Sequence, residues 1–304
     1  MKIAVMGAGA VGSYFGGMLS RAGREVWLVA RGAHLEALRN KGLTVESDQE
    51  SFTIPVRATG NPGEIGPVDL VLFCVKSYDT VEAARQAGPM LGPETVVLSL
   101  QNGVENEEVL AGIVGREKVM AGLCYVQADL AAPGLVRQAG PKKDIVFGEL
   151  SGEITERAQR ILTVFREAGI RATLTDDIRK AIWTKFLFIS AFSGITAVTR
   201  SSIGAIRETP EAWELYRELL QEAFIVGRAL GVNLPDNAVE ETLDFTRSLN
   251  ADATSSLMRD LKRGKRLEID ALCGTVVRLG ARAGVPTPAS RFVYSVLKVS
   301  QVEK

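Results

Sequence analysis

The chain has 304 residues, of which 46% are hydrophobic, and its 36 lysine and arginine residues balance its 36 aspartate and glutamate residues. This length is sufficient for two domains with sizeable cores. Zero net charge gives no electrostatic reason to expect nucleic acid or an anionic membrane as a partner. The three cysteines are scattered and form no CxxC pair, so we expect reduced thiols, no metal site and a cytoplasmic protein.

The apolar runs of the chain give no sign of export or of a membrane anchor. The N-terminus enters an apolar run without a charged leader or cleavage site, so we expect no signal peptide. The longest uncharged run, between Lys185 and Arg200, is too short to span a bilayer comfortably. The single histidine, His34, cannot form a metal site or a catalytic triad alone, and we interpret it as a surface or adenine-side loop residue.

The glycine-rich segment near the N-terminus is the most informative motif. An apolar run from Ile3 to Met6 leads into GAGAVG, and a helix-forming segment and a second apolar run follow. This strand–GxGxxG–helix–strand order is typical of a dinucleotide-binding unit, in which backbone N–H groups at the helix start attract the pyrophosphate. The predicted cofactor-binding residues of this loop are Gly7, Ala8, Gly9, Ala10, Val11 and Gly12.

The end of the second apolar run indicates which dinucleotide is bound. NAD-binding units usually carry an Asp or Glu there, which binds the ribose 2′-hydroxyl. Here the run leads into Arg31, and the next carboxylate is Glu36. A guanidinium suits a 2′-phosphate, although a solvated loop arginine would look the same in the sequence. We therefore predict NADP(H) as the cofactor.

The first half alternates apolar runs with helical patterns, which predicts an α/β fold with a mostly parallel sheet. The predicted strands are Lys2–Met6, Glu25–Ala30, Leu70–Val75, Thr95–Leu100 and Val119–Tyr125. Two pairs of short runs are expected as antiparallel additions: Thr44–Glu46 with Phe52–Arg57, and Gly134–Gln138 with Asp144–Phe147. Residues 152–168 have the pattern of an amphipathic helix.

After Thr175 the strand-like runs stop. Helical segments are predicted over residues 177–198, 209–231, 235–249, 252–262, 266–284 and 288–302. We therefore predict an N-terminal Rossmann NADP-binding domain over residues 1–175 and a C-terminal all-helical substrate and catalytic domain over residues 176–304. No flexible linker separates them, which favours a fixed cleft.

Two polar side chains follow predicted strands of the sheet. Lys76 ends the run VLFCV, and Asn102 follows VVLSL within Gln-Asn-Gly. Ligands of open α/β sheets bind beyond the carboxyl ends of the strands. Although Asn102-Gly103 also has the composition of an ordinary turn, we predict a site role for both Lys76 and Asn102.

Lys185 is the only charge between Lys180 and Arg200, in a helix that is apolar on nearly every side. Burying an ammonium without a partner is costly, so Lys185 is paired, functional, or a lysine whose tip reaches water. Glu268 is a candidate partner, because it extends the apolar stripe of the 266–284 helix by one turn; a carboxylate favoured by the helix dipole is the alternative. Ser255 and Ser256 have the pattern of a helix cap.

These residues suggest a reaction in which a reduced nicotinamide delivers hydride to a carbonyl carbon. The carbonyl oxygen then needs a proton, which Lys185 can donate because burial lowers the pKa of a lysine. Glu268 would orient Lys185, and Asn102 and Ser256 would hold substrate oxygens.

The chain resembles the ketopantoate reductase (2-dehydropantoate 2-reductase) family over essentially its whole length. The segments that carry the resemblance are GAGAVG, VKSYDT, LQNGVEN, IWTKF, SSLMRDL and GKRLEIDALCG. The resemblance implies that Lys185 is the general acid, Glu268 its paired glutamate, and Ser256 a substrate-binding residue. It also places Asn102 at cofactor and substrate, Arg31 at the 2′-phosphate, and Ala128 beside the nicotinamide. Glu268 counts among the cofactor-binding residues as well.

This sequence departs from the family pattern at four positions. Ile189, Ser193, Ile203 and Ala253 stand where well-studied members carry asparagines, and Thr199-Arg200 offers an alternative carboxylate grip. The resulting hypothesis is that the protein is a cytoplasmic NADPH-dependent reductase of a small 2-oxo acid. The expected substrate is 2-dehydropantoate, in pantothenate biosynthesis. The alternatives are a related reductase of another 2-keto acid and a non-catalytic NADP(H)-binding sensor. The expected partners are the substrate, no nucleic acid and no membrane; a homodimer stays open.

Overall fold

The computed structural model describes residues 1–302 and separates into two compact units. The first comprises Met1–Gln101 and Asn106–Ile178, and the second comprises Asn102–Glu105 and Arg179–Lys304, whose last two residues lie outside the described range. The prediction of two separate domains over residues 1–175 and 176–304 stays a prediction. The two units are described separately below.

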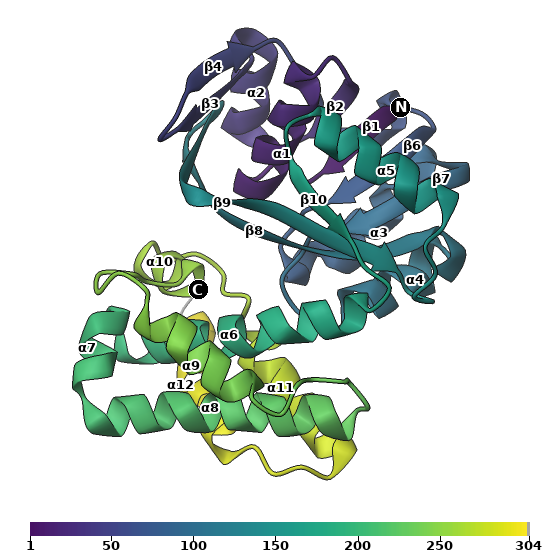
Figure 1. Cartoon of the computed structure of the whole chain (residues 1–304). Helices are drawn as coiled ribbons and strands as arrows, with labels where there is room; N and C mark the ends of the chain where they lie inside the picture. Colours follow the sequence, from purple (N-terminus) through teal and green to yellow (C-terminus); the bar gives the residue numbers. More distant parts are fainter. Residues whose placement is uncertain (303–304) are drawn as a thin grey trace. The chain divides into compact units, whose positions relative to one another are not determined.

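The first unit is built on one sheet with the strand order β4-β3-β9-β8-β7-β6-β1-β2-β5, and β10 also pairs with β9 (Figure 1). The pairs among β5, β2, β1, β6, β7 and β8 are parallel, β3 and β10 pair parallel with β9, and the β3–β4 and β8–β9 pairs are antiparallel. The strands are β1 Lys2–Met6, β2 Glu25–Val29, β3 Leu43–Ser47, β4 Ser51–Ile54, β5 Arg57–Thr59, β6 Val68–Phe73, β7 Leu91–Ser99, β8 Val119–Ala132, β9 Leu135–Glu149 and β10 Arg171–Leu174. This is the Rossmann-type arrangement that the sequence predicts.

Helices cover both faces of this sheet. They are α1 Ala10–Arg21, α2 Gly32–Lys41, α3 Thr80–Gln86, α4 Asn106–Val114 and α5 Glu156–Glu167, with short 3₁₀ turns at Pro62–Glu64, Ser77–Asp79, Gly88–Met90 and Arg116–Lys118. Side chains alternate along β1: Ile3 and Val5 belong to the core with α1 and α5, whereas Ala4 and Met6 belong to the core with α3 and α4. A strand buried on both faces reads as a continuous apolar run, which is why β1 and β6 stand out in the sequence.

The second unit is all-helical, as predicted. Its elements are α6 Ile178–Thr199, α7 Ile203–Glu208, α8 Pro210–Ala229, α9 Ala238–Arg247, α10 Ser256–Lys262, the 3₁₀ turn η5 Ile269–Ala271, α11 Cys273–Ala283 and α12 Pro288–Val302. Within the described chain, α6 alone is long and apolar enough to cross a membrane, and 61% of its most apolar window is buried. Phe186, Leu187 and Ile195 of α6 lie in the core of this unit, where they pack with α8, α11 and α12.

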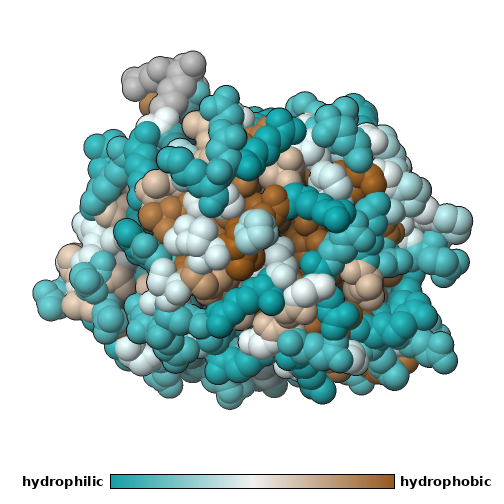
Figure 2. All heavy atoms as spheres, turned by 90° about the horizontal axis from the view of Figure 1, so that it is seen from above, coloured by the Kyte–Doolittle hydropathy of each residue, from teal (hydrophilic) through white to brown (hydrophobic). Residues whose placement is uncertain are grey.

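Several sequence-based predictions of elements differ from the structure. Phe52–Arg57 is not one strand, because β4 ends at Ile54 and Arg57 begins β5, which pairs parallel with β2. The helix predicted over 252–262 begins only at Ser256. The segment 266–284 is not one helix: η5 ends at Ala271, and Leu272, at φ −110° and ψ −104°, separates it from α11. The runs predicted over Gly134–Gln138 and Asp144–Phe147 do not pair with each other: from Leu135 on, both belong to the single strand β9, whose register against β8 shifts after Val126. The segment after Arg31 is not a loop, because α2 begins at Gly32. The view from above shows mostly hydrophilic side chains around smaller hydrophobic patches (Figure 2).

Candidate functional site

The glycine loop after β1 fits a dinucleotide phosphate. Gly7 has φ +96°, and a Cβ there would lie 2.7 Å from the Val75 side chain; a Cβ on Gly12 would lie 2.3 Å from the Gly7 carbonyl oxygen. Both glycines are therefore required by the packing of the protein itself. A Cβ on Gly9, in contrast, would meet no atom within 4 Å. The fold leaves open space in front of Gly9, where a pyrophosphate would approach the backbone.

The start of α1 supplies donors for that anion. Gly9 is the N-cap of this helix and provides no side-chain cap, and α1 begins with Ala10 and Val11. The first N–H groups of a helix have no partner within the helix, and its dipole favours negative charge there. Ala8 is buried and its N–H donates to the Val29 carbonyl oxygen at 2.8 Å, which fixes the loop against β2.

Arg31 lies where a 2′-phosphate would be recognised. It is the N-cap of α2, directly after the carboxyl end of β2, and Gly32 has φ +54°. Its side chain is exposed and makes no hydrogen bond or ion pair within residues 1–302. A free guanidinium at this position fits the NADP(H) prediction.

His34 is a helix residue with a structural role, which corrects its interpretation as a loop residue. It lies in α2, its Nδ1 accepts the Gly134 N–H at 2.9 Å, and its Nε2 lies 3.3 Å from Ser13 Oγ. Ser13 donates in turn to the Ala8 carbonyl oxygen at 2.9 Å, so His34 is the Nε2–H tautomer. Burial lowers its pKa, which keeps the ring neutral at physiological pH.

The loops that follow β6 and β7 meet at one edge of the sheet. Met6 is in register with Phe73, and Phe73 with Ser99, so these strands end at the same level. Lys76 lies half-buried directly before the turn Ser77–Asp79. Gln101 joins the two loops, because its Nε2 donates to the Val75 carbonyl oxygen at 2.9 Å and to Thr80 Oγ1 at 2.8 Å.

Sequence reasoning missed this role of Gln101. The motif Gln-Asn-Gly drew attention to Asn102 alone, and no spacing rule links Gln101 to a loop 26 residues earlier. The available signal was the position of Gln101 directly after the predicted strand Thr95–Leu100, at the edge where ligands bind.

The structure brings Asn102 and Lys185 together within the second unit. Lys185, on α6, is half-buried, and its Nζ donates to Asn102 Oδ1 at 2.8 Å. The residues are 83 positions apart in the chain. The sequence predicted a site role for each but did not pair them. This hydrogen bond to an amide oxygen fixes the direction of one N–H of the Lys185 ammonium.

Glu268 and Ser256 occupy positions different from those the helix pattern suggested. Glu268 is the N-cap of η5 and is half-buried, so it precedes a 3₁₀ turn instead of extending the α11 stripe. Its pairing with Lys185 stays a prediction. Ser255 caps α10 by accepting the Met258 N–H at 3.0 Å. Ser256 is the first residue of α10; it is exposed, and its hydroxyl makes no hydrogen bond to residues 1–302.

The four positions that lack the family asparagines differ in accessibility. Ile203 is fully buried in the core of the second unit, so its side chain packs and cannot line a pocket. Ile189 and Ala253 are half-buried beside that core. Ser193, two turns after Lys185 on α6, is 5% exposed. On α6, Lys185 is therefore followed one turn later by the apolar Ile189 and two turns later by the nearly buried Ser193.

Two further positions that the sequence predicted, Ala128 and Arg200, are not part of the glycine loop or of the Lys185–Asn102 contact. Ala128 is half-buried on β8 of the first unit, opposite Gln138 of β9. Arg200 is exposed directly after α6 and has φ +57°, a left-handed conformation that is unusual for a residue other than glycine. Nothing in the structure connects Arg200 to Lys185.

A Rossmann unit with an open glycine loop, together with a helical unit that carries an oriented lysine, defines a nicotinamide-dependent oxidoreductase. Residues 3–152 match the family described as ketopantoate reductase PanE/ApbA, and residues 177–301 match its C-terminal part. The chain belongs to the ketopantoate reductase family.

Individual relatives agree with this assignment. A 2-dehydropantoate 2-reductase of Mesorhizobium japonicum is 34% identical, over 100% of this chain and 99% of the relative. The crystal structure of a PanE/ApbA family ketopantoate reductase from Ralstonia eutropha JMP134 has a TM-score of 0.93 at 37% identity, covering 100% of this chain and 99% of that one. D-mandelate dehydrogenase, solved with NADH and anilino(oxo)acetate, shares the fold, with a TM-score of 0.92 at 24% identity over 100% and 99%.

The family assignment confirms the enzyme class and the cofactor. Ketopantoate reductases are NADP-dependent oxidoreductases that use NADPH, and this chain is one of them. The open space at Gly9 and the free guanidinium of Arg31 fit that cofactor. The roles of the individual site residues rest on the contacts described above and are taken up as proposals.

Proposed function

We propose that this enzyme reduces 2-dehydropantoate (ketopantoate) to pantoate, a step of pantothenate biosynthesis. The Lys185–Asn102 hydrogen bond of 2.8 Å is the observation that carries the proposal. It orients the ammonium of Lys185, the only charged residue of α6 after Lys180, and a reduction of this kind needs a proton donor for the carbonyl oxygen. Relatives named 2-dehydropantoate 2-reductase at 34% identity over the full chain support the choice of substrate.

The proposed division of labour follows from the chemistry of each group. When bound, NADPH supplies the hydride that reaches the carbonyl carbon. Lys185 donates a proton to the carbonyl oxygen, and Asn102 holds the ammonium in the orientation that this transfer needs. Glu268 pairs with Lys185 and orients it, and the free hydroxyl of Ser256 binds a substrate oxygen.

Cofactor binding is assigned to the first unit and the loops that follow its strands. The segment from Gly7 to Gly12 holds the pyrophosphate, Arg31 holds the 2′-phosphate, and Lys76 and Ala128 lie beside the remaining part of the dinucleotide. Asn102 and Glu268 contact the cofactor as well as serving Lys185.

A second substrate, a 2-keto acid without the distal hydroxyl, is favoured by one observation. Ile189 lies on α6 one turn after Lys185, where the family resemblance places an asparagine. Sites built to bind a hydroxyl reject analogues that lack it, because their buried polar groups are left unpaired. We expect ketopantoate reduction with weaker selectivity over 2-oxoisovalerate than in asparagine-bearing relatives.

The test is NADPH oxidation against a panel of 2-keto acids that includes ketopantoate and 2-oxoisovalerate, with Lys185→Ala beside the wild type. We expect turnover of ketopantoate and a loss of about 10²–10⁴-fold in Lys185→Ala, with NADPH binding retained. Near wild-type turnover in the variant would contradict the proton-donor role. A protein that binds NADPH but reduces no 2-keto acid would be a sensor instead.

We further propose that the enzyme is cytoplasmic and binds small molecules only. The balanced charge and the largely buried α6 support this proposal. A homodimer is the oligomeric form to test, by light scattering of the purified protein.

A further inference from the structure

The segment that carries Asn102 is part of the helical unit, although its neighbours in sequence are not. Asn102–Glu105 groups with Arg179–Lys304, whereas Gln101 and Asn106 belong to the first unit. Val104 packs against the hydrophobic core of the helical unit. These four residues therefore depend on contacts with distant helices for their position.

Glu105 supplies the polar contacts that fasten this segment to α11. Its Oε2 accepts from Arg278 Nη2 at 2.7 Å and from the hydroxyl of the buried Thr275 at 3.1 Å. Arg282, one turn further along α11, lies at 4.0 Å from the other carboxylate oxygen. Arg278 therefore makes the direct ionic contact, and Arg282 lies at the limit of one.

The same guanidinium also holds the segment that follows Glu268. Arg278 Nη1 donates to the Asp270 carbonyl oxygen at 3.0 Å. The Asp270 carboxylate accepts from the Tyr294 hydroxyl at 2.6 Å and from Lys298 Nζ at 2.9 Å, which fastens η5 to α12. Asp270 is two residues after Glu268, so its position restricts where Glu268 can lie.

We propose that Arg278 is a positioning residue for the reaction. One rigid, planar guanidinium joins Glu105, three residues after Asn102, to Asp270, two residues after Glu268. Arg278 thereby fixes the segments that carry Asn102 and Glu268, the two proposed partners of Lys185, relative to each other. The inference rests on the proposed roles of Asn102 and Glu268. It adds to them a role for Arg278, a residue to which no contact with substrate or cofactor is assigned.

The exposure of the pair separates this role from a stabilising one. The Arg278 and Glu105 side chains are 49% and 33% exposed, and ion pairs so accessible to water contribute little to stability. Small displacements of catalytic groups, in contrast, reduce turnover strongly. Loss of Arg278 should therefore affect kcat much more than Tm.

The experiment compares Arg278→Met with Arg282→Met as a matched control on the same helix. We expect Arg278→Met to lose about 10- to 100-fold in kcat at saturating substrate, with Tm close to that of the control, and Arg282→Met to stay within about twofold of the wild type. Arg278→Lys should be intermediate, since an ammonium lacks the fork that reaches both acceptors. Thr275→Val, which keeps the side-chain shape, provides a second test should Arg278→Met fold poorly.

Amide hydrogen exchange gives a readout that is independent of activity. Peptides covering residues 102–105 and 268–272 should exchange faster in Arg278→Met than in Arg282→Met. Equal kcat in these two variants, or unchanged exchange in both segments, would overturn the proposal. If the wild type reduces no 2-keto acid but the two variants still differ in exchange, the proposed function is rejected. The conclusion that Arg278 holds these two segments in place is then retained.

Discussion

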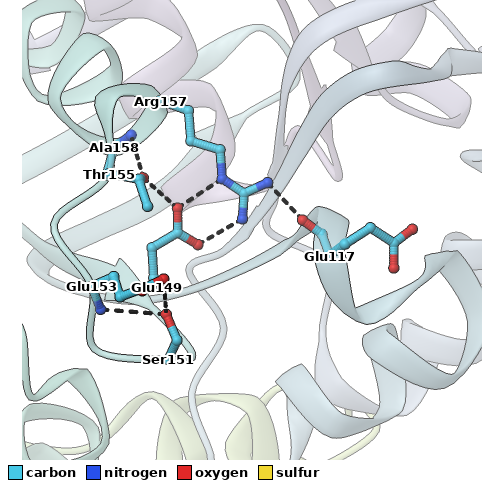
Figure 3. A network of polar contacts seen from close by, with 7 residues as sticks. All are labelled: Glu117, Glu149, Ser151, Glu153, Thr155, Arg157 and Ala158. Atoms are coloured by element: carbon cyan, nitrogen blue, oxygen red, sulfur yellow. Dashed lines mark hydrogen bonds and ion pairs between the residues drawn. The ribbon is translucent and has the colours of Figure 1, made fainter.

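The buried ion pair between Glu149 and Arg157 gives the stability prediction that the structure defines best (Figure 3). The Glu149 side chain, at the end of β9, is 5% exposed. Its carboxylate accepts from Arg157 Nε at 2.7 Å, from Arg157 Nη2 at 2.6 Å and from the Thr155 hydroxyl at 2.6 Å. Arg157 also donates to the Glu117 carbonyl oxygen at 2.6 Å, so it joins α5 to two other segments.

Replacing Arg157 by leucine leaves a buried carboxylate with one of its three hydrogen bonds. Breaking a buried ion pair costs about 3–5 kcal/mol. The Arg157 side chain is 32% exposed and the Thr155 contact survives, so we expect about 2–3 kcal/mol lost from the free energy of unfolding at pH 7. For a unit of this size that corresponds to a decrease in Tm of about 5–10 °C.

The effect should depend on pH in a defined direction. Burial opposes the charge of Glu149, but the hydrogen bonds from Arg157 and Thr155 hold its pKa below the ordinary 4.5. A depressed pKa contributes stability above 4.5 that is lost as pH falls through the pKa of the folded state. Without Arg157, burial raises that pKa, so the variant takes up a proton more readily. The difference between the two proteins should therefore shrink from pH 7 towards pH 4.

The assay is urea unfolding at pH 7, 5.5 and 4, with Arg160→Leu as the control. Arg160 is exposed on the same helix, so its replacement should change stability by less than about 0.5 kcal/mol. The reasoning is refuted if Arg157→Leu is no less stable than Arg160→Leu at pH 7. A difference that stays constant down to pH 4 would show that lost packing, and not charge, causes the effect.

Two predictions concern the cofactor. Gly9→Ala should keep the wild-type Tm and weaken NADPH binding. Gly12→Ala should lower both the Tm and the NADPH affinity, because its Cβ would lie 2.3 Å from the Gly7 carbonyl oxygen. Calorimetry and NADPH titration distinguish the two variants, and equal Tm losses would contradict the open space at Gly9. Arg31→Ala should remove about 10-fold or more of the preference for NADPH over NADH, measured by fluorescence titration; equal affinities in the wild type would reject the 2′-phosphate role.

The elements that the sequence predicts well are those fixed by local chemistry. The glycine loop, β1 and β6 are visible because burial on both sheet faces and a required positive φ at Gly7 restrict the residue types. The break at Leu272 could not be predicted, because apolar residues at every third or fourth position look the same in one helix and in a 3₁₀ turn followed by a helix. Gly140-Pro141 indicates a loop, yet the chain passes through it within β9 as an irregularity in the register.

The candidate site was predicted as separate residues, and its assembly was not. Lys185 is conspicuous as the only charge between Lys180 and Arg200, and Asn102 as a polar residue after a strand. Their contact spans 83 residues, and the Arg278–Glu105 contact spans 173. Hydrophobic periodicity describes faces of single elements, so it cannot select pairs over such separations. Arg278 itself has the appearance of an ordinary solvated arginine on α11.

The insertion of Asn102–Glu105 into the helical unit has a consequence for chimeric enzymes. Exchanging the C-terminal halves of two relatives at residue 178 would combine helices from one parent with the 102–105 segment from the other. Val104 and Glu105 would then meet a foreign core and a foreign α11. A chimera that also carries residues 102–105 from the donor of the helices preserves these contacts. The unit of exchange in this fold is therefore discontinuous in sequence.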